Sequence, residues 1–274
     1  MAHRTRTPAA RRILTSACAL LVAVGLAGCG STTGAAKQAA LDPQVIKAGT
    51  LTVCTSLGYP PFEFNQDGQP AGFDIDLAKE VAKQLQLKPV FINANFNAIQ
   101  SGQLLNDGRC DVAVAGISIN GERARVLDFS SPYFNTGQAM VVKSTSEATS
   151  LDDLGGEKIG VQKGTTSELF LTDNAPKNAT IVPLTTPGDV TDAIRKGDVA
   201  AGVYDNTVVG DVIERNPKLE VVAEFDTGEQ YGMAVKKDSS VDLLRFINNV
   251  LAKLKSGDGY DAIYNRWFGG ATTP

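Results

Sequence analysis

Histidine is almost missing from this sequence, and its scarcity excludes several kinds of chemistry. The single histidine, His3, lies ahead of an apolar run at the start of the chain. The rest of the chain therefore cannot use Ser-His or Cys-His nucleophile pairs, a histidine general base or imidazole metal ligands. No cysteine spacing typical of a metal site occurs either. We expect a protein without metal or cofactor.

Long hydrophobic runs are also missing. The most apolar stretch, from Ile13 to Leu26, is shorter than the roughly 20 apolar residues that a membrane-spanning helix needs. Four arginines and no acidic residue precede it, a pattern typical of an export signal. We predict an exported protein whose mature chain does not span the membrane.

The end of this signal reads "LAGC" and resembles the lipobox of bacterial lipoproteins. That resemblance implies a lipoprotein signal peptide at residues 1–28 and a lipid on Cys29, the only expected link to the membrane. The small and polar stretch that follows predicts a lipid anchor and flexible tether over residues 29–48. The arginine pair at 11–12 leaves both the general and the twin-arginine export routes open.

Cysteine is scarce in the part expected to fold. Cys18 belongs to the signal and Cys29 to the lipid anchor, which leaves Cys54 and Cys110. An oxidising compartment would allow these two to pair, but a bridge needs close Cα atoms and side chains that face each other. Both lie in short apolar runs that resemble parallel strands. We expect buried free thiols, with a disulfide as the alternative.

Positive charge is in deficit. From Cys29 onward, 22 Lys and Arg stand against 30 Asp and Glu, a formal net charge of −8. Such a balance repels phosphate backbones, and no basic patch with interleaved aromatic residues occurs. We expect no nucleic-acid partner.

Strand and helix patterns alternate in what remains. Apolar segments such as "LTVCT" and "KPVFIN" alternate with helical stretches such as "GFDIDLAKEVAKQL" and "NAIQSGQLLNDG". In the first helical stretch an apolar residue recurs every four positions, at Phe73, Leu77, Val81 and Leu85. The alternation predicts an α/β fold with parallel sheets covered by helices.

The pattern then restarts near residue 158, where "KIGVQKGTTSELFL" repeats the order of strand, polar turn and apolar segment. This weak repeat predicts two lobes of like construction. The segment after Gly232 is too short for a third lobe, so we expect it to complete the first. The predicted organisation is lobe 1 at 49–133 and 232–269, lobe 2 at 137–228, and a two-crossing hinge at 133–137 and 227–231. Two crossings favour hinge motion, with a ligand in the cleft between the lobes.

From about Gly49 to Gly269 the chain resembles the family 3 extracellular solute-binding proteins, which deliver polar amino acids to ABC importers. The resemblance rests on "YPPFEFNQDGQPAGFDIDLAKEVAKQL", "FNAIQSGQLLNDGRCDVAVAGISINGERARVLDFSSPYF", "VQKGTT", "VYDN", "QYGMAVKK" and "YNRWFG", in the family's order and spacing. It implies the two-lobed periplasmic-binding-protein fold and an importer's membrane subunits as partner. We expect a monomer that is not an enzyme.

The motif "GISINGERAR" indicates an anion site. Ser118 and Arg123 bracket what we expect to be a strand-to-helix turn with Asn120 as its N-cap. Free N–H groups at a helix start attract an anion, and a guanidinium fork matches a carboxylate. The residues alone fit surface ion pairs as well. The resemblance assigns Arg123 to the ligand carboxylate and leaves Arg125 as a solvated or structural charge.

A second turn, "VQKGTT", precedes a helix expected to begin near Ser167. By itself this is an ordinary capped helix. The resemblance implies that Thr165 and Thr166 hold the same carboxylate from the second lobe and that Gln162 reaches toward the ligand side chain.

Asp205 ends a small-residue strand, directly after Tyr204, where a parallel sheet presents ligands. An acid at a strand end is usually a turn or cap residue. The resemblance implies instead that Asp205 binds the ligand ammonium, helped by Ser118 and the carbonyl of Gly116, and it includes Tyr204 in the site.

Two aromatic residues, Tyr59 and Phe96, occupy positions where the family places walls against the ligand side chain. Other aromatics are expected in the core, namely Phe62, Phe64, Trp267 and Phe268. Ser56 departs from the family, because many relatives have an acid there that faces the ligand side chain.

The ligand class follows from this departure. A basic ligand would lack a partner for its second cation, and an acidic one would need a basic group beyond Arg123, for which Lys163 is the nearest candidate. We therefore expect glutamine, then glutamate or asparagine, with basic amino acids last. The predicted ligand-binding set is Ser56, Tyr59, Phe96, Gly116, Ser118, Arg123, Gln162, Thr165, Thr166, Tyr204 and Asp205.

Two alternatives remain at this point. Periplasmic dehydratases of the cyclohexadienyl type resemble the same fold, but such an enzyme would need a second acid or base beside Asp205, and the sequence offers no convincing one. A lipoprotein that senses the ligand for a signalling partner would look the same as an importer's receptor.

Overall fold

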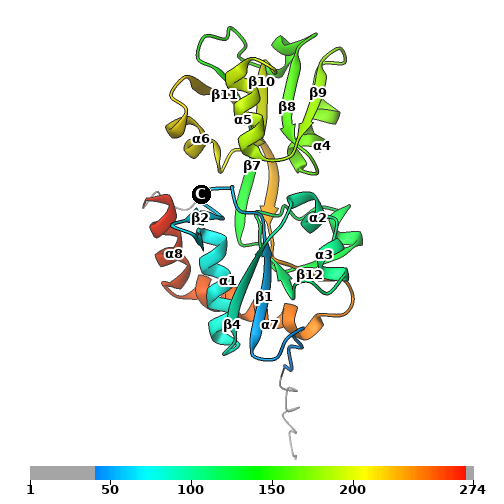
Figure 1. Cartoon of the computed structure of the whole chain (residues 1–274), viewed down its shortest axis with the longest axis vertical. Helices are drawn as coiled ribbons and strands as arrows, with labels where there is room; N and C mark the ends of the chain where they lie inside the picture. Colours follow the sequence, from blue (N-terminus) through cyan, green and yellow to red (C-terminus); the bar gives the residue numbers. More distant parts are fainter. Residues whose placement is uncertain (1–40, 270–274) are drawn as a thin grey trace, which may run out of the picture. The chain divides into compact units, whose positions relative to one another are not determined.

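Two five-stranded sheets organise the part of the chain that the computed structural model describes, residues 41–269 (Figure 1). The strand order is β4-β1-β5-β12-β6 in the first sheet and β11-β7-β10-β8-β9 in the second, and β2 and β3 form a separate hairpin. The strands are β1 (Thr50–Thr55), β2 (Phe64–Gln66), β3 (Gln69–Ala71), β4 (Lys88–Asn93), β5 (Val112–Ala113), β6 (Leu127–Phe129), β7 (Phe134–Lys143), β8 (Lys158–Gln162), β9 (Thr180–Leu184), β10 (Ala201–Asp205), β11 (Leu219–Tyr231) and β12 (Ala234–Lys236).

Helices cover both sheets. In the first lobe, α1 contacts β1, β4, α7 and α8, and in the second, α4 and α5 both contact β8, β9 and β10. The helices are α1 (Phe73–Gln84), α2 (Phe96–Gln100), α3 (Gln103–Asn106), α4 (Thr166–Asn174), α5 (Pro187–Lys196), α6 (Val209–Arg215), α7 (Val241–Ser256) and α8 (Gly259–Phe268), with 3₁₀ turns η1 (Arg123–Arg125) and η2 (Leu151–Leu154).

The apolar stripe predicted for α1 is buried at Phe73, Leu77 and Val81. The helix expected over residues 97–108 is interrupted, because Gly102 adopts a φ of +75° between α2 and α3. A left-handed residue cannot continue a right-handed helix, so two short helices replace one.

The sheets are mixed, whereas the sequence predicted parallel ones. β1 pairs in parallel with β4 and β5, and β8 with β9 and β10, but β12 and β7 pair antiparallel with their neighbours. Parallel neighbours need a crossover of a dozen or more residues. Helix-containing crossovers within one sheet precede β4, β5, β9 and β10, whereas the chain enters β7 and β12 from the other sheet, so no such crossover sets the direction of these two strands.

The chain passes between the sheets twice, from β6 to β7 and from β11 to β12. β7 and β11 pair with each other along their length, down to Tyr231 opposite Phe134. The two predicted hinge segments, 133–137 and 227–231, lie where these strands pair.

The aromatic residues that we expected in the core lie close together. Phe62 is fully buried, Phe268 and Trp267 pack against the same core, and Phe64 contacts Trp267 edge-on.

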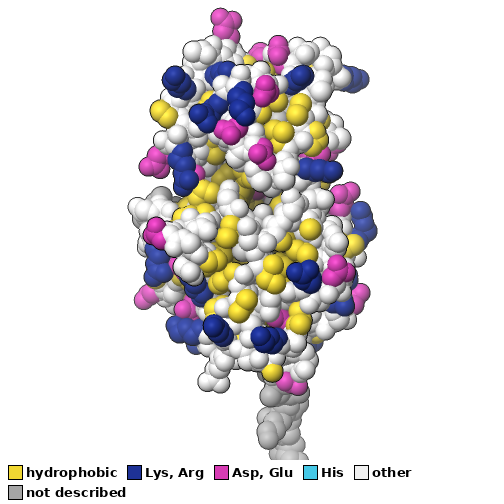
Figure 2. Space-filling view, in the orientation of Figure 1, with side chains coloured by type: hydrophobic (Ala, Val, Ile, Leu, Met, Phe, Trp, Pro, Cys, Tyr) yellow, Lys and Arg dark blue, Asp and Glu magenta, His cyan; other side chains and the backbone are white. Residues whose placement is uncertain are grey.

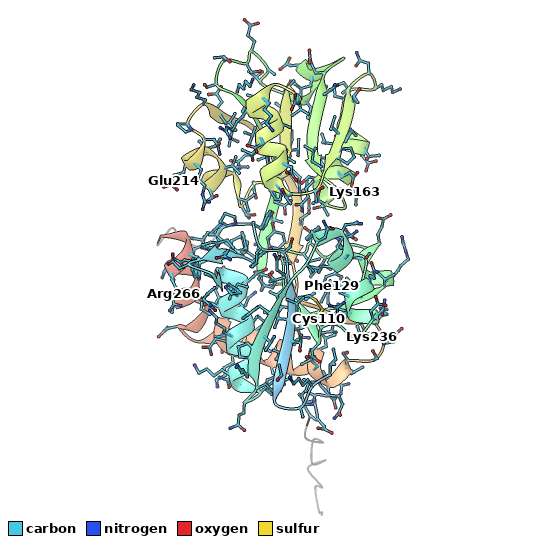
Figure 3. The ribbon with its side chains drawn as sticks, in the orientation of Figure 1. Cys110, Phe129, Lys163, Glu214, Lys236 and Arg266 are labelled. Carbon is cyan, nitrogen blue, oxygen red and sulfur yellow. A yellow bond between two sulfur atoms is a disulfide. The ribbon has the colours of Figure 1, made fainter. Side chains whose placement is uncertain are left out.

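Cys54 and Cys110 form a disulfide, so the expectation of free thiols was wrong (Figure 3). Their Cα atoms are 5.7 Å apart. β1 and β5 are neighbours in register Cys54 to Ala113, and Cys110 precedes the first paired residue of β5. Side chains within a strand alternate between the two faces of the sheet, but Cys110 lies outside the paired strand. Its side chain can therefore turn toward Cys54.

The predicted signal peptide, Cys29 and most of the tether lie outside the described residues. Within 41–48, the amide of Ile46 donates to Asp111 Oδ1 (2.6 Å) and Lys47 pairs with Thr50. This end of the predicted tether is therefore attached to the first lobe. Within residues 41–269 no helix has the length and hydrophobicity to cross a membrane.

Candidate ligand-binding site

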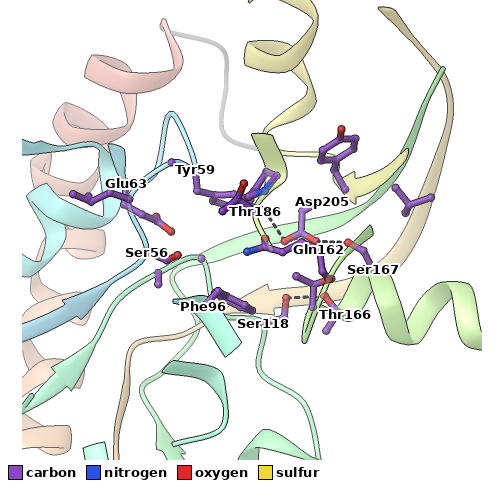
Figure 4. A pocket seen from close by; sticks show the side chains of 18 of the residues that line it. Ser56, Tyr59, Glu63, Phe96, Ser118, Gln162, Thr166, Ser167, Thr186 and Asp205 are labelled. Atoms are coloured by element: carbon purple, nitrogen blue, oxygen red, sulfur yellow. Dashed lines mark hydrogen bonds between the residues drawn. The ribbon is translucent and has the colours of Figure 1, made fainter. Parts of the chain in front are cut away.

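Residues of both lobes line one cavity that contains the predicted site (Figure 4). All the predicted ligand-binding residues line it, from Ser56 and Tyr59 through Gly116, Ser118 and Arg123 to Tyr204 and Asp205. Their roles toward a ligand stay predictions. The sequence analysis missed other lining residues: Leu57, Gly58, Glu63, Ala115, Ser167, Thr186, Pro187 and Val203.

Strand ends and helix starts converge on the cavity. β8 and β10 end at Gln162 and Asp205, while α4 and α5 begin beside it, with Thr165 and Thr186 as their N-caps. The Oγ1 atoms of these threonines accept from the amides of residues 168 and 189. The carboxyl edge of a parallel sheet and the positive ends of helices both favour a polar ligand.

Two glycines allow the chain segments around the cavity to approach each other. Gly116 has a φ of +54°, and a Cβ there would lie 2.9 Å from the ring of Tyr59. Gly164 has a φ of +80°, and a Cβ there would lie 2.6 Å from Oδ1 of Asn97 in the other lobe. Both positions therefore require glycine.

Arg123 lies in a three-residue 3₁₀ turn, and the predicted helix start at this place was wrong. The Asn120 side chain does accept from the Arg123 amide (2.9 Å), as a cap would. A turn this short sums few peptide dipoles, so the guanidinium itself must supply the positive charge. Arg125 is exposed and stands 3.8 Å from Glu122, as expected of a solvated charge.

The Arg123 side chain is only 3% exposed and connects the two lobes. Nη1 donates to the carbonyl of Ser118 (2.8 Å) and Nη2 to that of Gly164 (3.0 Å). Its guanidinium also lies over the Phe96 ring, 5.4 Å from the centroid. In residues 41–269 no acidic side chain forms a salt bridge with it. A buried cation without an anionic partner is a strong candidate to bind a carboxylate.

Asp205 approaches the same cavity from the second lobe. Tyr59 donates to its Oδ2 (2.8 Å), as does Tyr231, and the Gln138 amide donates to its Oδ1 (3.0 Å). Burial raises the pKa of Asp205, the charge of Glu229 adds to this, and the hydrogen bonds from Tyr231, Tyr59 and Gln138 act against it. Tyr59 therefore both lines the cavity and joins the lobes.

Other polar residues of the site also have partners of their own. Ser118 Oγ and Thr166 Oγ1 lie 3.4 Å apart across the lobes, and Tyr204 Oη lies 3.0 Å from Thr191 Oγ1. Gln162 donates to the carbonyl of residue 185 (3.3 Å) while lining the cavity. Lys163, the candidate basic group, is exposed and does not line it (Figure 3).

Glu63 is the lining residue that most changes the chemistry of the site. It is 1% exposed, and its carboxyl group points into the cavity beside Ser56 (Figure 4). Burial raises the pKa of Glu63 well above its usual range, and the charges of Asp74 and Asp205 add to the effect. The inference from Ser56 did not consider an acid other than the one missing at that position, and Glu63 is such an acid among the lining residues. In the sequence this acid stands between two phenylalanines in "PPFEF". The segment is a loop without helical or strand periodicity, so the sequence does not predict where the side chain of Glu63 points.

The visible face of the molecule carries basic and acidic side chains side by side (Figure 2). Within residues 41–269, no group of three or more His, Cys, Asp or Glu side chains is arranged to hold a metal ion.

Known proteins resemble this chain over most of its length. It is 33% identical over 227 residues to the "Putative ABC transporter arginine-binding protein 2" of Escherichia coli K12, covering 81% of this chain and 91% of the relative. It is 34% identical over 208 residues to the "ABC transporter glutamine-binding protein GlnH" of Bacillus subtilis 168, covering 73% of each.

Among solved structures, an "ancestral arginine-binding protein bound to arginine" superposes with a TM-score of 0.76 at 40% identity, covering 81% of this chain and 99% of that one. The same values hold for a structure of an ancestral arginine-binding protein bound to glutamine. Residues 51–270 match the bacterial extracellular solute-binding proteins, family 3. The chain therefore belongs to this family of solute-binding proteins.

Proposed function

We propose that this protein is an extracytoplasmic receptor that binds a polar L-amino acid between its lobes and delivers it to an ABC importer. One observation carries the proposal: Arg123 and Asp205 line the same cavity from different lobes. A guanidinium fork suits an α-carboxylate, and a carboxylate suits an α-ammonium. A zwitterion would bridge the two groups, which stabilises the closed arrangement of the lobes.

The side-chain specificity depends on Glu63, Ser56 and Gln162. These groups can accept and donate hydrogen bonds to a glutamine amide, and an ionised Glu63 would pair with a guanidinium. Glutamate would add another carboxylate beside Glu63 and Asp205, with no lysine among the lining residues. We therefore propose glutamine and arginine as the two leading ligands, with asparagine and glutamate behind them.

Competition calorimetry with glutamine, arginine, glutamate and leucine tests the ligand class. Glutamine and arginine should bind at least about tenfold more tightly than the other two, a difference of about 1.4 kcal/mol. Tightest binding to leucine would refute the polar pocket, and tightest binding to glutamate would refute the role given to Glu63.

The proposed membrane attachment is a lipid on Cys29, which lies outside the described residues. In cells, Cys29→Ser should move the protein from the membrane fraction to the soluble extracytoplasmic fraction, because no other anchor is expected. Its affinity for glutamine should stay the same. A variant that remains in the membrane fraction would refute the lipid anchor.

A second candidate function is an elimination reaction of the cyclohexadienyl-dehydratase type, and Glu63 is the observation that favours it. A buried carboxyl group with a raised pKa keeps its proton to a higher pH than usual and can act as a general acid. With Asp205 also lining the cavity, Glu63 would be the second acid or base that the sequence analysis did not find. Incubation with arogenate or prephenate tests this candidate, and the absence of an aromatic product would reject it.

A further inference from the structure

A second carboxyl group lies behind Glu63, away from the cavity. Asp74, in the first turn of α1, is completely buried and does not line the cavity. Its Oδ2 accepts from the amide of Gly116 (2.7 Å) and from the hydroxyl of Tyr133 (2.8 Å). Asp74 therefore connects α1 to two segments that surround the site.

One oxygen of each acid is buried without a hydrogen-bond donor. Asp74 Oδ1 and Glu63 Oε2 are buried and receive no hydrogen bond from any N–H or O–H group of residues 41–269. The amide of Asp74 donates to the carbonyl of Phe62 (3.0 Å), which places Asp74 next to Glu63, and the two carboxyl groups raise or lower each other's pKa. Two adjacent carboxylates cannot both be ionised in a buried site, so the pair retains a proton.

The surroundings place that proton on Glu63. Asp74 already accepts two hydrogen bonds, which favour its ionised form, whereas Glu63 Oε2 accepts none. Burial raises the pKa of Asp74 to about 7, while the bonds from Gly116, Tyr133 and Glu63 act against the rise. Burial and then the Asp74 charge raise the pKa of Glu63.

Other charged groups around Glu63 act in the same direction or are already engaged. Asp205 on β10 adds a negative charge that favours the neutral form of Glu63, and Tyr133 is a buried neutral phenol. Arg123 is the one cation among the lining residues, and it bonds to the carbonyls of Ser118 and Gly164. The cavity therefore has no resident cation free to neutralise an ionised Glu63.

We propose that a cationic amino acid binds by exchanging its side-chain charge for the proton that Glu63 and Asp74 share, whereas a neutral ligand leaves that proton in place. The O–H bond of Glu63 breaks, the proton passes to the solvent buffer, and the carboxylate accepts N–H groups of the ligand. Asp74 is then a positioning residue that sets specificity through Glu63. This inference rests on the proposed function.

Linkage fixes the sign of the pH dependence. Protons are released on binding of arginine, so its affinity rises with pH, by up to about tenfold per pH unit while the pair is protonated. Glutamine binding releases no proton, so its affinity stays flat over the same range. The ratio of arginine to glutamine affinity therefore rises with pH.

Calorimetry near neutral pH in three buffers of different ionisation enthalpy tests this proposal, with arginine and glutamine as ligands. The dependence of the observed enthalpy on buffer should give a release of about 0.5 to 1 proton for arginine and under about 0.2 for glutamine. Arginine binding without proton release would overturn the inference and leave the proposed function intact. Failure of both amino acids to bind would overturn the proposed function and this inference with it.

Three variants isolate the pair. Asp74→Asn should reduce the proton release, because the charge that holds the proton on Glu63 is removed. Glu63→Gln should abolish the release and lower the ratio of arginine to glutamine affinity at least tenfold. Glu80→Gln is the matched control on the same helix, because Glu80 pairs with Lys83 at the surface and does not line the cavity. A proton release in Glu63→Gln equal to that of the wild type would assign the proton to another group.

Discussion

Arg123 and Arg125 lie two positions apart and have opposite surroundings. The first is buried and holds the carbonyls of Ser118 and Gly164, whereas the second is exposed and pairs loosely with Glu122. Exposed ion pairs contribute little to stability. The same residue type can therefore be a ligand group or a solvated charge, depending on which residues fold around it.

Arg123→Ala should lower the affinity for glutamine on the order of 30-fold or more. Removal of one partner of a buried charge pair costs about 2 to 5 kcal/mol of binding. Isothermal calorimetry measures the affinity, and far-UV circular dichroism verifies that the variant is folded. Arg125→Ala is the matched control and should bind nearly normally. Equal losses in both variants would show that Arg123 does not hold the ligand.

At the scale of elements, the disulfide ties β1 to the segment before β5. It closes a long loop, since the two cysteines are 56 residues apart. Cys54→Ala with Cys110→Ala should lower the free energy of unfolding by about 4 kcal/mol, the value expected for a loop of this length. Urea unfolding measures the loss, and wild-type protein in reductant should show it too. Neither cysteine lines the cavity, so we expect the disulfide to affect stability and not ligand binding. A loss of binding free energy as large as the loss of stability would contradict this purely structural role.

β6 and the residues directly after β12 form a pH-dependent contact. Asp128 accepts from Lys237 Nζ (2.8 Å) and from the amide of Asp238 (2.8 Å). Partial burial raises the pKa of Asp128, but these hydrogen bonds outweigh it and the net shift is downward. A lowered pKa means that the contact stabilises the protein above the pKa of unfolded Asp and loses this effect as the pH falls through the folded value.

Asp128→Asn should therefore lower the melting temperature at neutral pH, and its difference from the wild type should shrink below the usual carboxyl range of about pH 4. Melting curves from pH 7 down to pH 3 measure this difference. A difference that stays constant over the whole range would show that the carboxylate charge of Asp128 contributes nothing.

The sequence predicted the elements that have a local signal, such as a periodic apolar spacing or an N-cap. Features that depend on contacts between distant parts of the chain were not predicted. The four-residue apolar spacing of α1 is a local signal, as is the threonine before α4, and both elements form as expected. Gly102 adopts a left-handed conformation that the sequence pattern did not predict, and this conformation divides the predicted helix into α2 and α3. The direction of Glu63 depends on how the loop after β1 packs against Asp74, 11 positions along the chain. The disulfide likewise depends on the register between β1 and β5, which is a contact between distant parts of the chain.

At the scale of the whole described chain, residues of both lobes line the site, and the chain passes between the two sheets only twice. The Gln138 amide on β7 donates to both Asp205 and Glu229, and so links β10 to β11 directly behind the cavity. Arg123 and Tyr59 add bonds from the first lobe to the second. A ligand that binds both Arg123 and Asp205 would therefore form additional contacts between the lobes, beside those that Arg123 and Tyr59 already make. Its binding energy should stabilise both lobes together.

The single tryptophan allows this coupling to be measured. Trp267 lies on α8, donates to Asp76 Oδ2 (3.0 Å) on α1 and reports on the first lobe. Far-UV circular dichroism reports on the helices of both lobes. With glutamine at about 100 times its dissociation constant, the folded state should gain about 2.7 kcal/mol. Both thermal transitions should then rise together, by roughly 5 to 10 °C for a protein of this size.

A tryptophan transition that rises alone would mean that the first lobe holds the ligand without help from Asp205. Arg123→Ala at the same glutamine concentration is the control for both signals. It should show little shift in either, because the ligand then lacks its carboxylate partner. If the variant shifts as far as the wild type, the carboxylate must bind elsewhere, and the bridge between the lobes cannot be the source of the stabilisation.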